Sequence, residues 1–232
     1  MNLRIFDSVD DLIRGAARTI IQKVKSGARS IALSGGSTPR PLYELLGSGE
    51  WHEQLAAVPI TWVVVDERCV PIDDPQSNAG MIQQTLFARG IPGGHQFLRF
   101  RTELGDAARI AADFEEQWRV LGLEGLDVVL LGMGDDGHTA SLFPGTPVLE
   151  VKDRVAAAVF VPRLNAWRVT LTAPVLRAAA LRMVLVAGSS KTGVLEEIRN
   201  GADYPIARVT RDVETWWFVD KNGIKHLSDI MQ

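Results

Sequence analysis

The segment 132–138 (GMGDDGH) contains the residues of this sequence best suited to proton transfer. Its three glycines allow a loop to wrap closely around a reacting group, and His138 ends the segment. Imidazole is the side chain best matched to proton transfer near neutral pH, and Asp135 and Asp136 can orient it or stabilise its charge. We expect His138 to carry acid–base chemistry. The alternatives are a structural histidine and a metal-binding loop.

A second segment, 34–39 (SGGSTP), has the composition of a phosphate-binding turn. Gly35 and Gly36 let the backbone approach an anion, and the exposed N–H groups and the following helix N-terminus supply partial positive charge. Ser37 and Thr38 add hydroxyl donors. An ordinary turn with a Ser/Thr cap is the alternative.

A third segment, 188–192 (GSSKT), places Lys191 at the start of a predicted helix. A cation is unfavourable there because the helix N-terminus carries partial positive charge, and a bound phosphate would remove that penalty. A solvated lysine is the alternative. Leu185 and Ser190 stand where a P-loop requires glycine, so ATP binding is not expected.

A fourth segment, 66–71 (DERCVP), combines two acids and an arginine. Asp66 can orient a ligand hydroxyl, and Arg68 can pair with an anion through its planar fork. An internal salt bridge among Asp66, Glu67 and Arg68 is the alternative. Cys69 is interpreted as a small buried residue rather than a nucleophile.

Other catalytic motifs are missing or incomplete. There is no G-x-S-x-G elbow for a serine hydrolase. GMGDDG has dinucleotide-binding spacing but leads into HTASLFP rather than a clear helix, so no cofactor is expected. His52, His95 and His226 lack metal-ligand spacing and are interpreted as surface or loop residues, so no metal site is expected.

The elements that must position these segments alternate between short apolar runs and amphipathic stretches. Strands are predicted at 3–6, 30–33, 61–65, 127–131, 181–187 and 215–219, and helices at 8–25, from near 39, and at 78–88, 106–120 and 191–199. This alternation predicts an α/β fold with one domain over 1–232: a doubly wound (Rossmann-like), mostly parallel sheet with helices on both faces. Ligands of such sheets bind beyond the carboxyl ends of the strands, so the four polar segments should converge.

Composition narrows the class of protein. The chain has 232 residues, 46% of them hydrophobic, and a formal net charge of −3 without a Lys/Arg-rich arm, so nucleic acid is not an expected partner. A single cysteine excludes an internal disulfide. The N-terminal stretch lacks the unbroken apolar run of a secretory signal, and the longest apolar runs are too short to cross a bilayer. We expect a cytoplasmic protein without membrane contact.

Taken together, the sequence resembles the 6-phosphogluconolactonase branch of the glucosamine-6-phosphate isomerase/6-phosphogluconolactonase superfamily. Five segments carry the resemblance, in the expected order: LSGGSTPRPLYELL (33–46), VVDERCVPIDDPQSNAGM (64–81), LLGMGDDGHTASLFPGTP (130–147), RVTLTAPVL (168–176) and GSSKTGVL (188–195). The resemblance covers essentially the whole chain. It implies a Rossmann-like fold and cofactor-free hydrolysis of 6-phospho-glucono-1,5-lactone in the pentose phosphate pathway.

The resemblance also implies roles for individual residues. The catalytic set is His138 as general base, with Asp66 and Arg68. The phosphate- and substrate-binding set is Gly35, Gly36, Ser37, Thr38, Gly134, Arg168 and Lys191. Whether Arg163 or Arg168 contacts the substrate stays open. Backbone N–H groups of the Gly-rich loop are expected to stabilise the oxyanion of the tetrahedral intermediate.

Two alternatives accompany this interpretation. The sister deaminases follow the GDDGH string with a segment that carries an extra acid, whereas 139–144 here (TASLFP) has none, and they typically have an aromatic residue where Arg68 stands. Both departures favour the lactonase. A non-catalytic sugar-phosphate sensor should carry an N-terminal helix-turn-helix, whereas this sequence begins with a predicted strand. The oligomeric state is left open, with a monomer favoured.

The cysteine count and the histidine spacing generate a prediction about metals. Prolonged treatment with a chelator should leave the catalytic rate unchanged, because no ligand set of suitable spacing is present. Activity measured before and after chelation, with re-addition of divalent ions, tests this. Reversible loss restored by one ion would contradict it.

Overall fold

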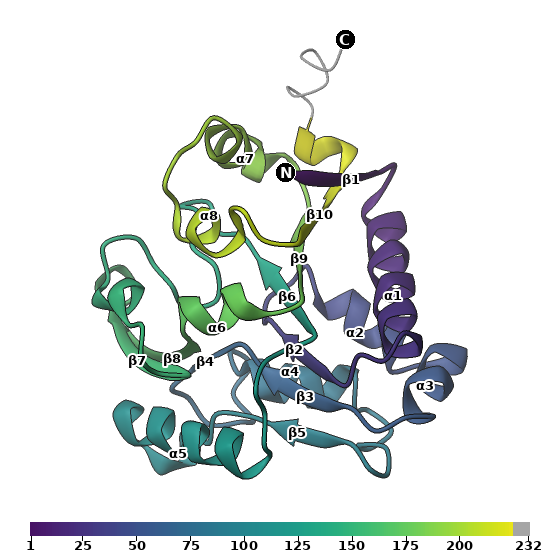
Figure 1. Ribbon diagram of the computed structural model, residues 1–232, viewed down its shortest axis with the longest axis vertical. Coiled ribbons are helices and arrows are strands. Elements are labelled where there is room, and N and C mark those ends of the chain that lie inside the picture. Colours follow the sequence, from purple (N-terminus) through teal and green to yellow (C-terminus); the bar gives the residue numbers. More distant parts are fainter. Residues whose placement is uncertain (225–232) are drawn as a thin grey trace.

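The computed structural model describes residues 1–224, which form two β-sheets and the helices around them (Figure 1). The large sheet consists, in spatial order, of β1 (Asn2–Phe6), β10 (Thr215–Asp220), β9 (Leu181–Val186), β6 (Val128–Gly132), β2 (Ser30–Leu33), β3 (Thr61–Val64) and β5 (Gln96–Leu98). All neighbouring pairs in it are parallel. The small antiparallel sheet consists of β4 (Asp66–Arg68), β8 (Ala166–Leu171) and β7 (Ala156–Val161).

Helices cover both faces of the large sheet, as expected for a doubly wound fold. They are α1 (Val9–Lys25), α2 (Arg40–Leu46), α3 (Gly49–Ala56), α4 (Asn78–Thr85), α5 (Ala107–Val120), α6 (Ala173–Ala178), α7 (Thr192–Arg199) and α8 (Pro205–Thr210). In Figure 1, α1, α2 and α3 lie on one side of the sheet, and α6, α8 and the small sheet lie on the other. Helix α5 packs against β7 and β8 of the small sheet.

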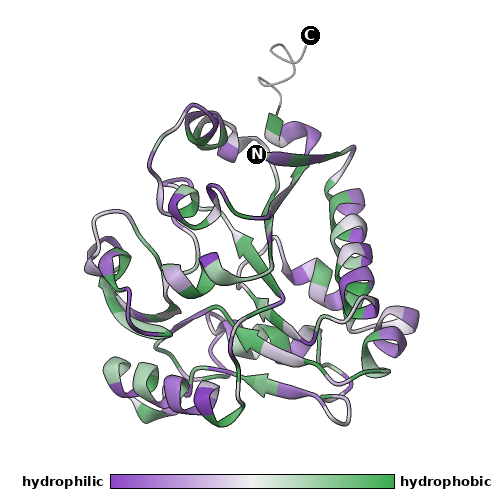
Figure 2. Ribbon diagram, in the orientation of Figure 1, coloured by the Kyte–Doolittle hydropathy of each residue, from purple (hydrophilic) through white to green (hydrophobic). Residues whose placement is uncertain are grey.

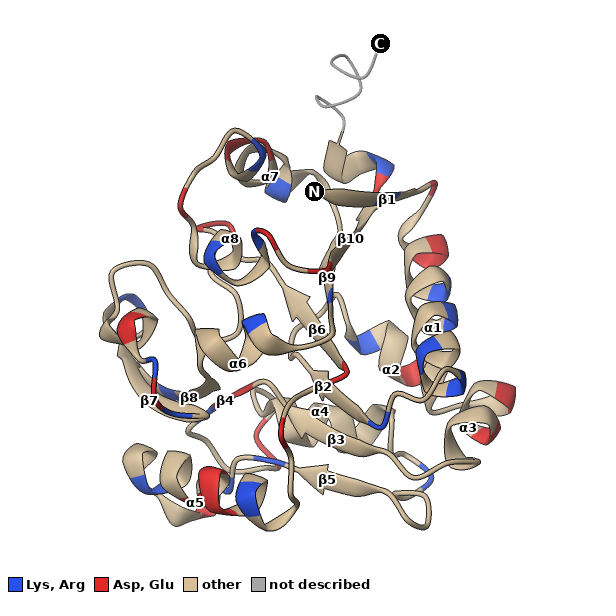
Figure 3. Ribbon diagram, viewed as in Figure 1, with Lys and Arg blue, Asp and Glu red and all other residues tan. Residues whose placement is uncertain are grey.

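The central strands are apolar because helices cover both of their faces. Every residue of β2 and β9 is buried, and the strands of the large sheet are mostly green in the hydropathy view (Figure 2). Charged residues lie mainly on helices and loops (Figure 3). Among residues 1–224, no helix combines the length and the apolar character needed to span a membrane.

The strand order creates a crevice at the centre of the large sheet. From β2 the chain continues outward through β3 to β5, then returns to β6 on the opposite side of β2 and proceeds to β9 and β10. The connections that leave β2 and β6 therefore diverge. Such a switch point, at the carboxyl ends of the strands, is where ligands bind in open α/β sheets.

All of the predicted strands and helices are present, with ends that differ by at most three residues. The Ser8 side chain caps α1 by accepting a hydrogen bond from the Asp11 N–H, as its position predicted. The prediction of one sheet was incomplete, because the small sheet was not foreseen. Its strand β4 is only three residues long, and all three residues are charged. It pairs with residues about a hundred positions away, such as Asp66 with Thr170. Local sequence does not encode such pairing.

The Asp127 carboxylate joins the amino ends of β2 and β6, the two strands that flank the switch point. Asp127 Oδ2 accepts hydrogen bonds from the N–H groups of Arg29 (2.7 Å) and Ser30 (2.9 Å) and from the Ser30 hydroxyl (2.9 Å). The Asp127 N–H donates in return to Ser30 Oγ at 2.9 Å. The register between β2 and β6, and hence the position of the loops that follow them, depends on this contact.

Replacing Asp127 with Ala should lower the free energy of unfolding by about 2 kcal/mol, because hydrogen bonds to a charged group contribute roughly 1.5–3 kcal/mol. Chemical denaturation of the variant and the wild type measures the difference. Asp153→Ala is the control, since Asp153 is exposed. Equal stability of the two variants would contradict the assignment.

Candidate active site

The four polar segments meet in one cavity of about 400 Å³ at the carboxyl ends of β2, β6 and β9. Every residue assigned to the site from the sequence lines it: Gly35, Gly36, Ser37, Thr38, Asp66, Arg68, Gly134, His138, Arg168 and Lys191. Arg163, which was left open, lines it as well. The predicted convergence is confirmed, whereas the roles of the individual residues stay predictions.

The Gly-rich loop after β6 closes on itself and presents His138. The Gly134 N–H donates to the His138 carbonyl oxygen (2.9 Å), and the Gly137 N–H donates to the Gly134 carbonyl oxygen (3.0 Å). Gly137 has φ of +70°, which favours glycine. A side chain at Gly134 would overlap the His138 ring. The two glycines are therefore required for the close approach that orients the imidazole.

Asp136 fixes the orientation and the tautomer of His138. Asp136 Oδ1 lies 2.5 Å from His138 Nδ1 and also accepts the His138 backbone N–H at 3.2 Å. Partial burial raises the pKa of Asp136, but the hydrogen bond to His138 and the nearby charges, including that of Arg163, leave it below its ordinary value. An ionised Asp136 assigns the proton to Nδ1, which leaves the Nε2 lone pair free to accept a proton.

An aromatic ring supports the same imidazole from one face. The buried Phe143 ring stacks on His138 with a centroid separation of 4.2 Å and an interplanar angle of 25°. Nothing in the sequence indicates this contact, because Phe143 looks like an ordinary apolar residue of the loop. Between Asp136 at its edge and Phe143 at its face, the ring of His138 has little rotational freedom.

The turn between β2 and α2 has backbone N–H groups that are free to bind an anion. No hydrogen bond from the backbone N–H groups of residues 35–38 is found within the described chain. Gly36 has φ of +108°. Gly35 packs directly against the Asn78 side chain, which would overlap any Cβ at that position. Asn78 in turn donates to the Asp66 carbonyl oxygen at 2.7 Å, so α4 holds the turn in place.

Lys191 lies in a short 3₁₀ turn (Ser189–Lys191) that precedes α7, rather than in the first turn of the α-helix. Its ammonium forms an ion pair with the Asp135 carboxylate. The alternative of a solvated lysine is therefore wrong. Asp135 is 74% exposed, so an anion that enters the cavity can compete with it for Lys191 at modest cost.

The acids of β4 do not pair with Arg68, so the internal salt bridge considered as an alternative is not formed. Asp66 is buried and accepts a hydrogen bond from the Ser141 hydroxyl at 2.6 Å. Buried Glu67 accepts the N–H groups at the start of α4 at 2.7 and 2.8 Å. Arg68 donates to the Gln76 carbonyl oxygen. Only Asp66 and Arg68 of the three line the cavity.

Arg68 and Arg168 are neighbours across the β4–β8 pair. The Nε atoms of both are buried without a hydrogen-bond partner, and no acid within residues 1–224 forms a salt bridge with either. Burial and the charge of Arg68 lower the pKa of Arg168 from its ordinary value. Both arginines line the cavity, and two adjacent guanidinium groups without an acid partner can attract an anion.

Cys69 is half-buried beside Arg168 and stays a thiol near neutral pH. Burial, with a contribution from the charge of Glu67, raises the pKa of Cys69 to about 11. A thiolate is the nucleophilic form of cysteine. Cys69 therefore fits the interpretation that it is not a nucleophile.

His52 and His95 do not line the cavity. His95 is in a loop, as predicted, but it is buried rather than exposed, and its Nδ1 accepts a hydrogen bond from Trp62 Nε1 at 2.9 Å. His52 is part of α3. His226 lies outside the described residues. Within 1–224, no group of three or more His, Cys, Asp or Glu side chains is arranged to hold a metal ion.

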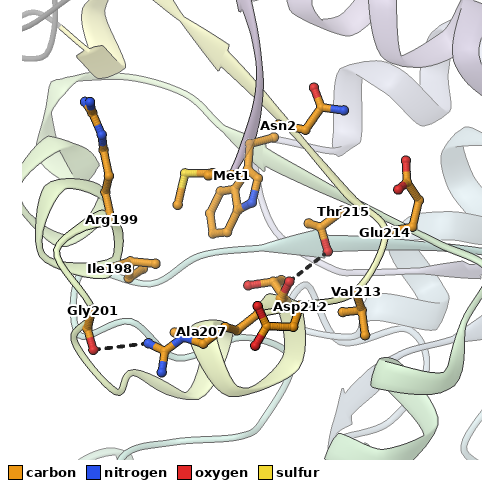
Figure 4. A pocket seen from close by; sticks show the side chains of 13 residues that line it. Met1, Asn2, Ile198, Arg199, Gly201, Ala207, Asp212, Val213, Glu214 and Thr215 are labelled. Atoms are coloured by element: carbon orange, nitrogen blue, oxygen red, sulfur yellow. Dashed lines mark hydrogen bonds between the residues drawn. The ribbon is translucent and has the colours of Figure 1, made fainter.

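A larger cavity, of about 620 Å³, lies elsewhere, at the amino ends of β1 and β10 (Figure 4). Met1, Asn2 and Thr215 line it together with residues of α7 and α8. Arg211 there donates to the carbonyl oxygens of the α7–α8 connection at 3.1 and 3.0 Å. Its lining includes no histidine and no residue of the four polar segments, so its larger volume does not make it the candidate active site.

Comparison with known proteins gives the family. Residues 5–217 match the family described as glucosamine-6-phosphate isomerases/6-phosphogluconolactonase. A 6-phosphogluconolactonase of Nostoc sp. is 35% identical over 94% of this chain and 92% of its own length. The structure of 6-phosphogluconolactonase from Trypanosoma cruzi superposes with a TM-score of 0.85 at 30% identity, covering 98% of this chain and 97% of the other.

The chain belongs to the glucosamine-6-phosphate isomerase/6-phosphogluconolactonase family. The resemblance seen in the sequence is confirmed, as is the prediction that the chain is an enzyme. A monomeric glucosamine-6-phosphate deaminase also superposes, with a TM-score of 0.81 at 20% identity, over 96% of this chain and 98% of the other. At that identity the likeness extends to the fold alone.

Proposed function

We propose that this chain hydrolyses 6-phospho-D-glucono-1,5-lactone to 6-phosphogluconate, a step of the pentose phosphate pathway. One observation carries the proposal: a histidine held by Asp136, with its Nε2 left to accept a proton, shares a cavity with the free backbone N–H groups of the turn 35–38. Hydrolysis of a phosphorylated lactone needs both features. The named relatives support this choice of substrate.

In the proposed mechanism His138 activates water. Nε2 accepts a proton as the water oxygen adds to the lactone carbonyl carbon, and Asp136 stabilises the resulting imidazolium through the Nδ1–H bond. His138 then returns the proton to the ring oxygen as the carbon–oxygen bond of the lactone breaks. The product is the open-chain acid, and the histidine is regenerated as a neutral base.

Stabilisation of the oxyanion is assigned to different donors from those first expected. The N–H groups of Gly134 and Gly137 are engaged within the loop, and that of His138 donates to Asp136. These three donors of the Gly-rich loop are therefore occupied. In the proposal Arg68 takes the role, because it lines the cavity and no acid within residues 1–224 forms a salt bridge with it.

The phosphate is assigned to the turn 35–38 together with Lys191 and Arg168. The N–H groups of the turn have no other acceptor within the described chain, and Arg168 has no acid partner there. Lys191 exchanges Asp135 for the phosphate when substrate binds. Binding energy from this distant group positions the lactone carbonyl against His138. Asp66 accepts a sugar hydroxyl.

Deamination of glucosamine 6-phosphate is the alternative, and the lining of the cavity favours the lactonase. Asp66 is the one carboxylate among the described residues that line it, and the segment after His138 adds none. Release of ammonia from glucosamine 6-phosphate, without lactone hydrolysis, would support the deaminase. Binding of sugar phosphates without turnover of either substrate would support a sensor.

Substitution of His138 tests the proposed base. His138→Gln or His138→Ala should reduce lactone hydrolysis by roughly 10²–10⁴-fold while the product 6-phosphogluconate still binds, since the loss of a general base affects the chemical step. A kinetic assay corrected for spontaneous ring opening, together with product titration by calorimetry, measures both. A variant that keeps most of the wild-type kcat would remove His138 from this role.

Lys191→Ala tests the phosphate site. It should mainly raise KM, because the phosphate takes no part in bond breaking, with some loss of kcat if the phosphate positions the lactone. Combined with Thr38→Ala, the effects should be non-additive if both side chains contact one group. A structure with bound phosphate or product decides: an anion against the turn with Lys191 out of hydrogen-bonding reach would refute the shared site.

A further inference from the structure

The β7–β8 hairpin carries Arg163 to the catalytic histidine. A short 3₁₀ turn (Pro162–Leu164) forms the tip of the hairpin, and Asn165, with φ of +45°, ends it. Arg163 and Leu164 line the cavity beside His138. The hairpin is held at its base by pairing of β8 with β4 and by packing of α5 against both strands. The hairpin is therefore well supported, and it places the half-exposed Arg163 beside His138.

The guanidinium of Arg163 contacts each group that holds His138. Nη1 lies 2.8 Å from Asp136 Oδ2, which is the carboxylate oxygen that does not face the imidazole. Nη2 lies 3.4 Å from His138 Nδ1. The guanidinium carbon lies 4.8 Å from the Phe143 ring centroid. Asp136 thus bridges His138 and Arg163, one through each oxygen.

The contact between Arg163 and His138 is a charge contact rather than a hydrogen bond. With Asp136 ionised, His138 Nδ1 carries a hydrogen that it donates to Asp136, and an arginine N–H cannot donate to it. When the imidazole accepts a proton at Nε2, two positive groups face each other at this edge. Arg163 therefore opposes formation of the imidazolium, whereas Asp136 favours it.

Other titratable groups approach His138 from the elements around it. Lys191, from the start of α7, is paired with Asp135. Tyr204, from the α7–α8 connection, is hydrogen-bonded to Glu197 and feels the charge of Asp136. Asp66, Arg68 and Arg168 line the same cavity from β4 and β8.

We propose that Arg163 is a positioning residue for the His138 base. It anchors the Asp136 carboxylate in the orientation that holds the imidazole, and its positive charge offsets the negative charge of Asp136 beside the ring. This inference rests on the proposed function. It concerns the charge balance of the Asp136–His138 pair rather than a contact between Arg163 and the substrate.

The pH dependence of hydrolysis separates this role from a merely structural one. In Arg163→Ala the acid limb of the kcat/KM profile should move to higher pH by about one unit, the size of effect expected from a nearby charge. On the acid limb, below the wild-type midpoint, activity should fall about tenfold, which is the same shift expressed as a rate, and it should recover toward the wild-type value on the alkaline side. Arg163→Lys should restore part of the shift, because it keeps the charge but not the planar fork.

The control is Arg154→Ala, which removes the same charge from an exposed position just before β7. Its profile should superimpose on that of the wild type. An Arg163→Ala profile that is lowered equally at every pH would overturn the proposal, because it would mean that the residue only supports the shape of the site.

A measurement without substrate keeps this inference distinct from the proposed reaction. The imidazole resonances of His138, followed by NMR against pH in the unliganded protein, should show a higher titration midpoint in Arg163→Ala than in the wild type. An unchanged midpoint overturns the inference even if the wild type hydrolyses the lactone. A raised midpoint in a protein without lactone hydrolysis supports the charge balance while the proposed function fails.

Discussion

The pairing of β2 with β6 at the centre of the large sheet is the constraint on which the site depends. Both strands are parallel and start together at the Asp127–Ser30 contact, so their carboxyl ends fall at the same edge. The chain then leaves them in opposite directions. The Gly-rich turn 35–38 and the loop that carries His138, separated by about a hundred residues, are thereby brought to face one cavity.

The small sheet supplies the arginines that line the cavity. Its strand β8 carries Arg168 beside Arg68 of β4, and the tip of its hairpin carries Arg163 to Asp136. A chain with a net charge of −3 can thus present a locally cationic cavity. The guanidinium groups have different surroundings: Arg68 and Arg168 retain unsatisfied buried donors, whereas Arg163 is paired with an acid. Their proposed roles differ for this reason.

Most of the acids in the polar segments contact other groups of the protein. Asp136 binds His138 and Arg163, Asp135 binds Lys191, and Glu67 accepts the N–H groups at the start of α4. These contacts hold the cations and the imidazole in place before any ligand enters. Preorganisation of this kind reduces the cost of orienting charged groups during the reaction. Asp66, by contrast, faces the cavity and is available to a hydroxyl of the ligand.

The elements of the large sheet and the segments that line the cavity could be predicted from the sequence. Apolar runs such as 61–65 and 181–187 identify strands covered on both faces, and parallel topology brings the ends of such strands together. Glycines 35, 36, 134 and 137 mark the turns because close approach or positive φ excludes larger residues.

The partner of each charged group became clear only from the folded chain. Glu67 looked like a partner for Arg68 but accepts the helix α4 N–H groups, and Lys191, for which a solvated position was the alternative, pairs with Asp135. The stacking of Phe143 on His138 and the contact of Arg163 with Asp136 join separate loops. Side-chain pairing depends on distances in space between segments far apart in the chain, and residue types and local spacing do not contain those distances.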